Sequence, residues 1–291
     1  MQETQTPDTL TDIRNEIDRI DNEVHDLFMA RASLVSSVAQ AKRGKGMQIV
    51  QPAREARLMR RLLARHKGLL PRRTIIRIWR ELISSVSMLQ TGLSVAVADE
   101  EGFERWDMAK NYFGSSLPMR SVGGLQNTIS EVIKDHADFA VMPWPEMDGE
   151  NPWWSNLFNL QKDEQLSIIC ALPYDNTEGL QTSNVVDKAL VISKVSFTAS
   201  DMDNSFIGLE LDAGVSRTNI SAQAKASKLD LISMYSAPSA HNDTSKVCLL
   251  CVKGFVAKNN KKLINLAQRF GDACHYYDAI GGYPVIPESE D

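Results

Sequence analysis

Two positively charged side chains, Arg31 and Lys42, lie on an apolar stripe near the start of the chain. Stepping by four and three, the stripe reads Ile13, Ile17, Ile20, Val24, Leu27, Arg31, Leu34, Val38 and Lys42, which predicts a helix with one buried face. The two cations are roughly 16 Å apart along that helix, so each can hold part of a small anion. Because buried charges are costly unless they are paired, the residues alone leave a structural ion pair and an anion site equally open.

Two further predicted helices bring polar partners to these cations. The second helix runs from Pro52 to about Lys67 and has Arg54 and Glu55 one turn before its apolar positions, which are Leu58, Met59 and Leu62. The third helix begins near Pro71 and steps through Trp79, Ile83, Val86, Gln90 and Leu93. The polar residues that these helices would bring together have no nucleophile beside a base and no metal-ligand spacing; they are Arg31, Lys42, Arg54, Glu55 and Gln90. This set suits a dicarboxylate and the polarisation of one of its oxygens.

Residues 8–94 resemble the all-α class of chorismate mutases. The matching stretches are Asp12-Ile-Arg-Asn-Glu-Ile-Asp18, Arg31 with Leu34 and Val35, Ala39-Gln-Ala-Lys42, Arg54-Glu55, and Trp79-Arg-Glu-Leu-Ile83 up to Gln90. The family's fold is a three-helix domain that forms an intertwined dimer. Its reaction converts chorismate to prephenate without a cofactor, a metal or a covalent intermediate.

The resemblance implies a substrate site made of Arg14, Arg31, Lys42, Gln51, Arg54, Glu55, Val86 and Gln90. In this site Arg31 and a partner chain's Arg14 grip carboxylates, Lys42 and Gln90 donate to the ether oxygen, and Glu55 accepts from the ring hydroxyl. Two positions depart from the family pattern. Gln51 replaces a common acidic residue and Val86 replaces a common serine, so we expect weaker binding with the catalytic groups retained.

Arg14 and Arg31 cannot hold one small substrate from the same helix. They are seventeen residues apart, which corresponds to about 25 Å along a continuous helix. Arg14 is therefore expected to serve the site of a second copy, as a two-fold dimer built on this helix would allow.

The charge distribution separates the two halves of the chain. Residues 1–94 carry 16 Lys and Arg against 10 Asp and Glu, and residues 95–291 carry 16 against 27. The basic half suits an anionic substrate. No recognisable nucleic-acid-binding motif is present, which argues against nucleic acid as a partner. With no apolar leader and no bilayer-length run, we expect a cytoplasmic protein without membrane contact. The four cysteines form no disulfide framework, and packing in the core is their expected role.

Residues 95–200 change to an α/β pattern. Strands are predicted at 94–98 and 137–142 and helices at 105–112 and 126–134. Tyr112-Phe-Gly114 and the segment 137–143 resemble the first lobe of prephenate dehydratase. The second lobe has no room between Leu172 and Asp187, and Asp187-Lys-Ala189 stands where that family has a threonine-arginine-phenylalanine signature. We therefore expect a truncated and catalytically inactive region.

Residues 201–287 predict a βαββαβ order, which is that of a ferredoxin-like unit. Strands are expected at 205–209, 229–234, 247–252 and near 273–280, and helices at 215–227 and 258–270. Together with Gly281-Gly-Tyr-Pro284, this order resembles an ACT domain, which implies an aromatic amino acid as effector. Tyr235-Ser-Ala-Pro238 replaces the family's glutamate-serine-arginine-proline run, which argues against phenylalanine.

The sequence thus predicts a multidomain chain with a mutase domain at 8–94, a dehydratase-like α/β region at 95–200 and an ACT-like domain at 201–287. The predicted function is chorismate mutase, an isomerase of aromatic amino-acid biosynthesis, acting as a homodimer. The C-terminal half is expected to be catalytically inactive, and packing, dimer support and transmission of a regulatory signal stay open as its roles. Two alternatives stay open: a bifunctional mutase and dehydratase, and a non-catalytic amino-acid sensor or scaffold.

Overall fold

A computed structural model describes residues 9–42, 50–91, 93–98, 104–146, 152–158, 165–176, 188–240 and 242–287. These residues fall into two compact units. Helix α1 (Leu10–Lys42) forms the first, and the residues from Val50 onward form the second. None of the described helices is both long and apolar enough to cross a membrane.

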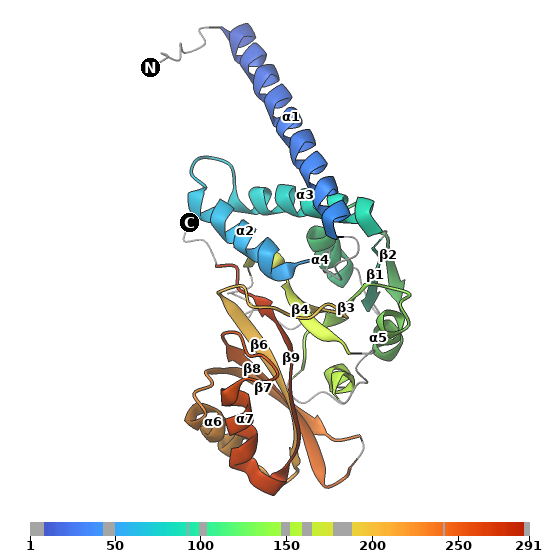
Figure 1. The fold of residues 1–291 in the computed structure, drawn as a ribbon, viewed down its shortest axis with the longest axis vertical. Coiled ribbons are helices and arrows are strands. Elements are labelled where there is room, and N and C mark those ends of the chain that lie inside the picture. The colour runs from blue at the N-terminus through green and yellow to red at the C-terminus, as the bar shows by residue number, and fades with distance from the viewer. Residues whose placement is uncertain are drawn as a thin grey trace. The chain divides into compact units, whose positions relative to one another are not determined.

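Helix α1 is one unbroken helix, as the stepping pattern predicts (Figure 1). Within its unit the apolar stripe is exposed, with Leu27 and Leu34 each 69% accessible and Ile13, Ile17, Ile20 and Val24 between 40% and 51%. The polar side carries an ion-pair set in which Arg19 contacts Glu16 and Glu23. Such a long apolar stripe is typical of a surface that another helix covers.

Helices α2 (Pro52–Arg65) and α3 (Arg72–Thr91) belong to the second unit. Proline at the first position suits the start of α2 because its missing N–H needs no partner there. The turn between the helices contains Gly68 at a φ of 115°, a conformation that glycine adopts readily. Met59 is buried, as expected, while Leu58 and Leu62 are half-buried. Ala56, Met59, Leu63 and Ile76 join a core with residues of the strands and of α4 (Glu104–Phe113).

One nine-stranded sheet runs through the second unit, in the order β2-β1-β3-β5-β4-β9-β6-β8-β7. Strands β1 (Val95–Ala98), β2 (Met119–Val122) and β3 (Phe139–Pro143) are parallel, and β3, β5 (Ala189–Ser193) and β4 (Ser167–Leu172) are antiparallel. Helix α5 (Leu125–Ile133) connects β2 to β3. A parallel contact between Ile168 of β4 and Gly281 of β9 (Cys274–Pro284) joins this half to the C-terminal strands.

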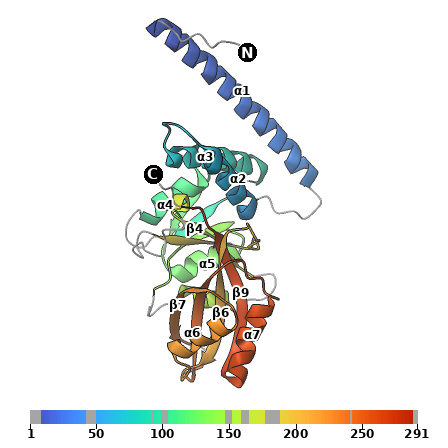
Figure 2. The ribbon, with the colours of Figure 1, turned by 90° about the vertical axis from the view of Figure 1, so that its left-hand side faces the viewer.

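The C-terminal part follows the predicted element order. It comprises β6 (Asp203–Asp212), α6 (Arg217–Ala226), β7 (Leu231–Pro238), β8 (Ser245–Lys253), α7 (Lys261–Phe270) and β9. Helices α6 and α7 lie together against one face of these strands (Figure 2). Strand alternation sends Cys248 into the core under α6 and α7 and Cys251 into the core on the opposite side.

Three features of the α/β part differ from the expectation. Strands β2 and β4 were not predicted, and β9 continues to Pro284 instead of ending near residue 280. Strand β2 has half-buried and exposed residues, Met119-Arg-Ser-Val122, so its composition carries little strand signal. The extension of β9 pairs Asp203 with Pro284, a contact between distant segments that local pattern does not contain.

Candidate active site

Glu55 and Arg80 form an ion pair between α2 and α3. Arg80 Nη1 donates to Glu55 Oε2 over 2.6 Å, and the Arg80 and Glu55 side chains are 5% and 12% exposed, respectively. Arg80 Nε also donates to the Tyr112 carbonyl over 2.8 Å. The guanidinium carbon lies 3.9 Å from the centre of the Tyr112 ring and 5.2 Å from that of Tyr174. Glu55 is therefore held in place by a cation that is itself fixed on three sides.

The surroundings of Arg80 keep its charge. Burial acts to lower the pKa of Arg80, but the neighbouring Tyr112 and Glu55 raise that pKa overall. Burial raises the pKa of both Tyr112 and Tyr174. At neutral pH the two phenols are thus uncharged, and Glu55 faces the single cation of Arg80.

A small hollow lies beside this ion pair. Its lining comes from α2, α3, α4 and the strands: Val50, Glu55, Arg80, Ile83, Ser84, Leu93, Tyr112, Phe113, Leu117 and Phe139. The hollow has room for about 20 Å³, which is about the space of one water molecule. The described residues of the second unit therefore enclose no substrate-sized space at Glu55.

The predicted site residues Arg14, Arg31 and Lys42 all lie on the continuous helix α1. Arg14 is exposed and Arg31 is half-buried, with an interaction of its own. Because α1 is continuous between them, they are about 25 Å apart along one helix, so one chain cannot close both around a small molecule. Lys42 ends the helix, and its side chain lies outside the described residues.

The first turn of α2 brings three predicted residues together. Gln51 precedes the helix and its carbonyl accepts from the Glu55 backbone N–H over 3.0 Å. Arg54 is exposed, Gln51 is half-buried and has a polar partner, and Glu55 points to Arg80. Val86 and Gln90 are on α3 as predicted, but their side chains are outside the described residues.

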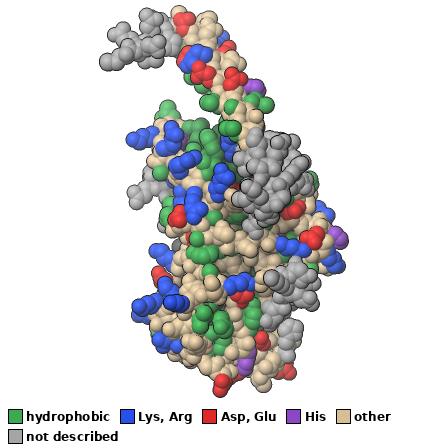
Figure 3. All heavy atoms as spheres, viewed as in Figure 1, with side chains coloured by type: hydrophobic (Ala, Val, Ile, Leu, Met, Phe, Trp, Pro, Cys, Tyr) green, Lys and Arg blue, Asp and Glu red, His purple; other side chains and the backbone are tan. Residues whose placement is uncertain are grey.

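Basic side chains gather on the exposed side of α2 and α3 (Figure 3). The exposed members are Arg54, Arg57, Arg61, Arg65, Lys67, Arg73 and Arg77. Arg80 is the buried one among the ten basic residues between 54 and 80. A surface of this kind raises the local concentration of small anions.

Sequence reasoning assigned no role to Arg80 or Glu81, although both lie in the Trp79-Arg-Glu-Leu-Ile83 stretch. Glu81 accepts from the Ser115 backbone N–H over 2.9 Å and from its hydroxyl over 2.6 Å. It lies so close to Gly114 that a Cβ there would be 2.8 Å from Glu81 Oε2. A usable signal was present in the sequence, because Arg80 comes four residues after the apolar Ile76 and three before the apolar Ile83, which places it on an apolar helix face.

Removing Arg80 should destabilise the second unit strongly. Arg80→Met leaves Glu55 and the Tyr112 carbonyl without their buried donor, which we expect to lower the free energy of unfolding by about 3–5 kcal/mol. Urea unfolding measures this change. Arg77→Met, one turn earlier and exposed, is the matched control and should change stability little. Equal unfolding midpoints for Arg80→Met and Arg77→Met would contradict the described role of the ion pair.

Cysteine and metal chemistry find no support in the described residues. Burial raises the pKa of Cys170 and Cys251 to about 12 and that of Cys248 to about 11, so these thiols stay protonated and unreactive. Among the described residues, no three His, Cys, Asp or Glu side chains are placed to hold a metal ion.

The strand β5 begins where the dehydratase signature was sought. Strand β4 ends at Leu172, and β5, which pairs with it antiparallel, begins at Ala189. Lys188 is buried, and its ammonium lies 5.0 Å from the Trp144 ring. Burial lowers the pKa of Lys188. Trp144 Nε1 in turn donates to the Tyr235 hydroxyl over 2.8 Å, so this region packs against β7.

Comparison with known proteins finds a family match for the first three helices. Residues 13–91 match the chorismate mutase type II family. The bifunctional chorismate mutase/prephenate dehydratase of Aquifex aeolicus is 29% identical over 138 residues, which are 46% of this chain and 38% of that protein. The chain therefore spans about two fifths of the length of the curated relatives that it matches.

The comparison with solved structures finds two prephenate dehydratases, both at low identity and with TM-scores below 0.5. The enzyme from Streptococcus mutans is 14% identical with a TM-score of 0.46, covering 67% of this chain and 100% of that chain. The enzyme from Arthrobacter aurescens, solved in complex with L-Phe, is 10% identical with a TM-score of 0.49, covering 68% and 93%. The family match and the curated relative together show that the chain carries a chorismate mutase type II domain at residues 13–91 and is related to the bifunctional chorismate mutase/prephenate dehydratases.

Proposed function

We propose that this protein rearranges chorismate to prephenate. The observation that carries the proposal is the family match over α1, α2 and α3, which contain all eight expected substrate positions except Gln51, the residue just before α2. The reaction is intramolecular, so the protein has to select a compact substrate conformer and stabilise the charge that develops on the ether oxygen.

Each expected residue has a role that its chemistry supports. Arg31 binds a carboxylate through its planar fork of donors, and Lys42 and Gln90 donate to the ether oxygen. Glu55 accepts from the ring hydroxyl through one carboxylate oxygen, while the other stays bonded to Arg80. Arg54 orients both substrate and Glu55.

The active form is a homodimer in which Arg14 completes the site of the partner chain. The exposed apolar stripe of α1 supports a helix-to-helix contact between two copies of the chain. Packing the stripe against the same stripe of an identical chain removes its apolar side chains from water.

The remaining residues act as a regulatory half without dehydratase activity. We assign the mutase domain to residues 8–94, the dehydratase-like region to 95–200 and a ferredoxin-like, ACT-like domain to 201–287. The βαββαβ order from β6 to β9 supports the last assignment, and an aromatic amino acid is the effector class it implies. The segment between Leu172 at the end of β4 and Ala189 at the start of β5 is too short for the second lobe that dehydration needs.

A bifunctional mutase and dehydratase is the second candidate function. The description of the curated relatives favours it, and those relatives are longer than the part of them that this chain matches. A non-catalytic sensor or scaffold is the third, with Arg31 and Lys42 serving structural ion pairs.

Product identification separates the three functions. We expect purified protein given chorismate to accumulate prephenate, and protein given prephenate to form phenylpyruvate no faster than buffer does. Chromatography with mass detection measures both products over time. Phenylpyruvate above the background would favour the bifunctional enzyme, and unchanged chorismate would favour the sensor or scaffold.

A further inference from the structure

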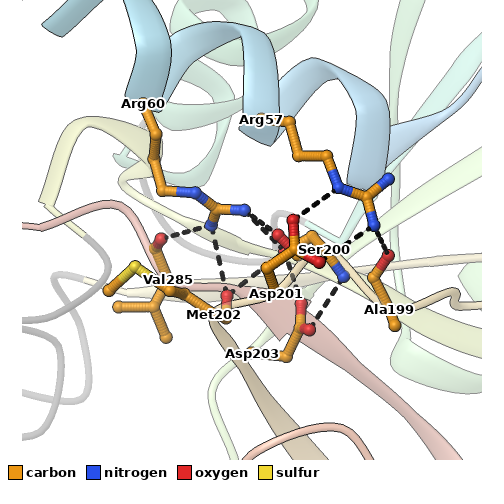
Figure 4. Close-up of polar contacts among 8 residues, drawn as sticks. All are labelled: Arg57, Arg60, Ala199, Ser200, Asp201, Met202, Asp203 and Val285. Carbon is orange, nitrogen blue, oxygen red and sulfur yellow. Dashed lines mark hydrogen bonds and ion pairs between the residues drawn. The ribbon is translucent and has the colours of Figure 1, made fainter. Parts of the chain in front are cut away.

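Helix α2 is held on both flanks of its buried face. On one flank Glu55 bonds to Arg80. On the other flank Arg57 and Arg60 point toward the loop 199–203, which leads into β6 (Figure 4). At about 100° per residue, Glu55 and Arg60 lie on opposite sides of the buried Ala56 and Met59.

Arg60 makes the larger set of contacts. Its Nη1 donates to the Val285 carbonyl over 2.8 Å and to the Met202 carbonyl over 3.2 Å. Its Nη2 donates to the carbonyl and, over 3.1 Å, to the hydroxyl of Ser200. Burial lowers the pKa of Arg60 and the Asp203 carboxylate opposes that effect, so the guanidinium keeps its charge at neutral pH.

Arg57 adds an ion pair at the rim of the same loop. Its Nε donates to Asp201 Oδ2 over 2.7 Å and its Nη2 donates to the Ala199 carbonyl over 2.8 Å. The side-chain hydrogen bond lowers the pKa of Asp201 and raises that of Arg57. The exposed ion pair alone contributes little stability, so its effect is mainly on orientation.

The loop is shaped to receive the two arginines. Asp201 adopts a φ of 80°, which is uncommon for a residue with a Cβ and requires support from its surroundings. Asp203 gives that support by accepting from the Ser200 backbone N–H over 2.8 Å and from the Ser200 hydroxyl over 2.5 Å. The carbonyls of residues 199, 200 and 202 are thereby available to α2.

The acceptors belong to the ends of two paired strands. Asp203 of β6 pairs with Pro284 of β9, and the Val285 N–H donates to the Met202 carbonyl over 2.8 Å. A displacement of these strand ends is thus transmitted to Arg60 directly.

We propose that Arg57 and Arg60 are positioning residues of the mutase site. By fixing the rotation of α2 about its axis, they set where Arg54 and Glu55 are presented, so the C-terminal half controls the geometry of the site through the loop 199–203. This inference rests on the proposed function, because Arg54 and Glu55 matter only if chorismate binds there.

The test compares Arg60→Met with Arg61→Met in the full chain. Arg61 is exposed on the same helix, so its variant is the matched control. We expect Arg60→Met to lower kcat/KM for chorismate roughly 10- to 100-fold, because misplacing a binding group by about 1 Å has effects of that size. We also expect KM to rise. A smaller amount of folded protein would lower the apparent kcat and leave KM unchanged, so the rise in KM distinguishes positioning from stability.

Hydrogen exchange of α2 gives a readout that does not depend on turnover. The amides of residues 53–65 should exchange faster in Arg60→Met and at the wild-type rate in Arg61→Met. If the wild type itself does not convert chorismate, the proposed function fails while exchange still tests the contact. A folded Arg60→Met protein with wild-type kcat, KM and α2 exchange overturns the inference.

A milder pair of variants covers the case in which Arg60→Met does not fold. Asp201→Asn removes the ionic partner of Arg57 and keeps the size of the side chain, whereas Asp243→Asn makes the same change at an exposed site outside the loop. We expect KM to rise about two- to fivefold in Asp201→Asn alone. Equal KM values for the two variants count against the positioning role.

Discussion

Gln90→Glu should keep mutase activity in acid and lose about 10²- to 10³-fold of kcat/KM as the pH rises. An amide donates a hydrogen bond to the ether oxygen at any ordinary pH, whereas a carboxyl group donates only while it is protonated. Above its pKa the new glutamate faces developing negative charge with a negative charge. Burial raises that pKa from about 4.3 and the nearby cations lower it, so the loss falls between acid and neutral pH.

The measurement is kcat/KM for chorismate between acid and neutral pH in both proteins. The wild-type profile should lack the additional fall, which makes the ratio of the two profiles the informative quantity. Identical profile shapes would mean that Gln90 is not the donor and that its amide only satisfies neighbouring groups on α3.

Mixing Arg14→Ala with Arg31→Ala protein should restore activity that neither variant has alone. If the site uses Arg31 of one chain and Arg14 of its partner, half of a statistically exchanged population is heterodimer, and each heterodimer has one intact site of two. We therefore expect up to about a quarter of wild-type activity, provided that each substitution inactivates its site fully.

Subunit exchange has to be verified in the same sample, for instance with two tags of different mass. As a control, Arg19→Ala, which lies on the polar side of α1, is mixed with Arg31→Ala. This mixture should have only the activity of the intact sites that the Arg19→Ala chains contribute. Complete exchange without recovery in the Arg14 and Arg31 mixture, or full activity in a monomer, would exclude a shared site.

The helices could be predicted because their pattern is local. The four-and-three stepping from Ile13 found all of α1, and Pro52, Gly68 and Pro71 marked the ends of α2 and α3 to within about two residues. The C-terminal order was equally visible, since β6, β8 and α7 have strong periodic patterns and Asn260 caps α7 by accepting from the Lys262 N–H.

The joining of the parts could not be predicted in the same way. Sequence reasoning treated three helices as a bundle sufficient in itself, but Ala56, Met59, Leu63 and Ile76 are buried in a core shared with α4 and the strands. Strand β9 reaches β4 through Gly281, where a Cβ would lie 2.1 Å from the Ile168 carbonyl oxygen. Such contacts join elements that are far apart in the sequence, more than a hundred positions for Gly281 and Ile168, so a local periodic pattern does not predict them.

The same limit applies to the site. Glu55 was identified with its family position, but the residue that holds its carboxylate was not identified. The partner is Arg80, and the residues that fix α2 from the other side, Arg57 and Arg60, read in sequence as ordinary surface charges. Most of their acceptors are backbone carbonyls between 140 and 225 positions later in the chain, and residue types do not reveal such acceptors.

The most direct test of the mutase assignment is a time course of chorismate consumption followed by NMR, with wild-type and Arg31→Ala proteins purified in parallel. A contaminating host mutase would act equally in both preparations. The account predicts that the wild type converts chorismate to prephenate far faster than buffer does, and that Arg31→Ala, folded by circular dichroism, loses at least about 10² of that rate. Equal rates in the two preparations, or no acceleration by the wild type, would contradict it.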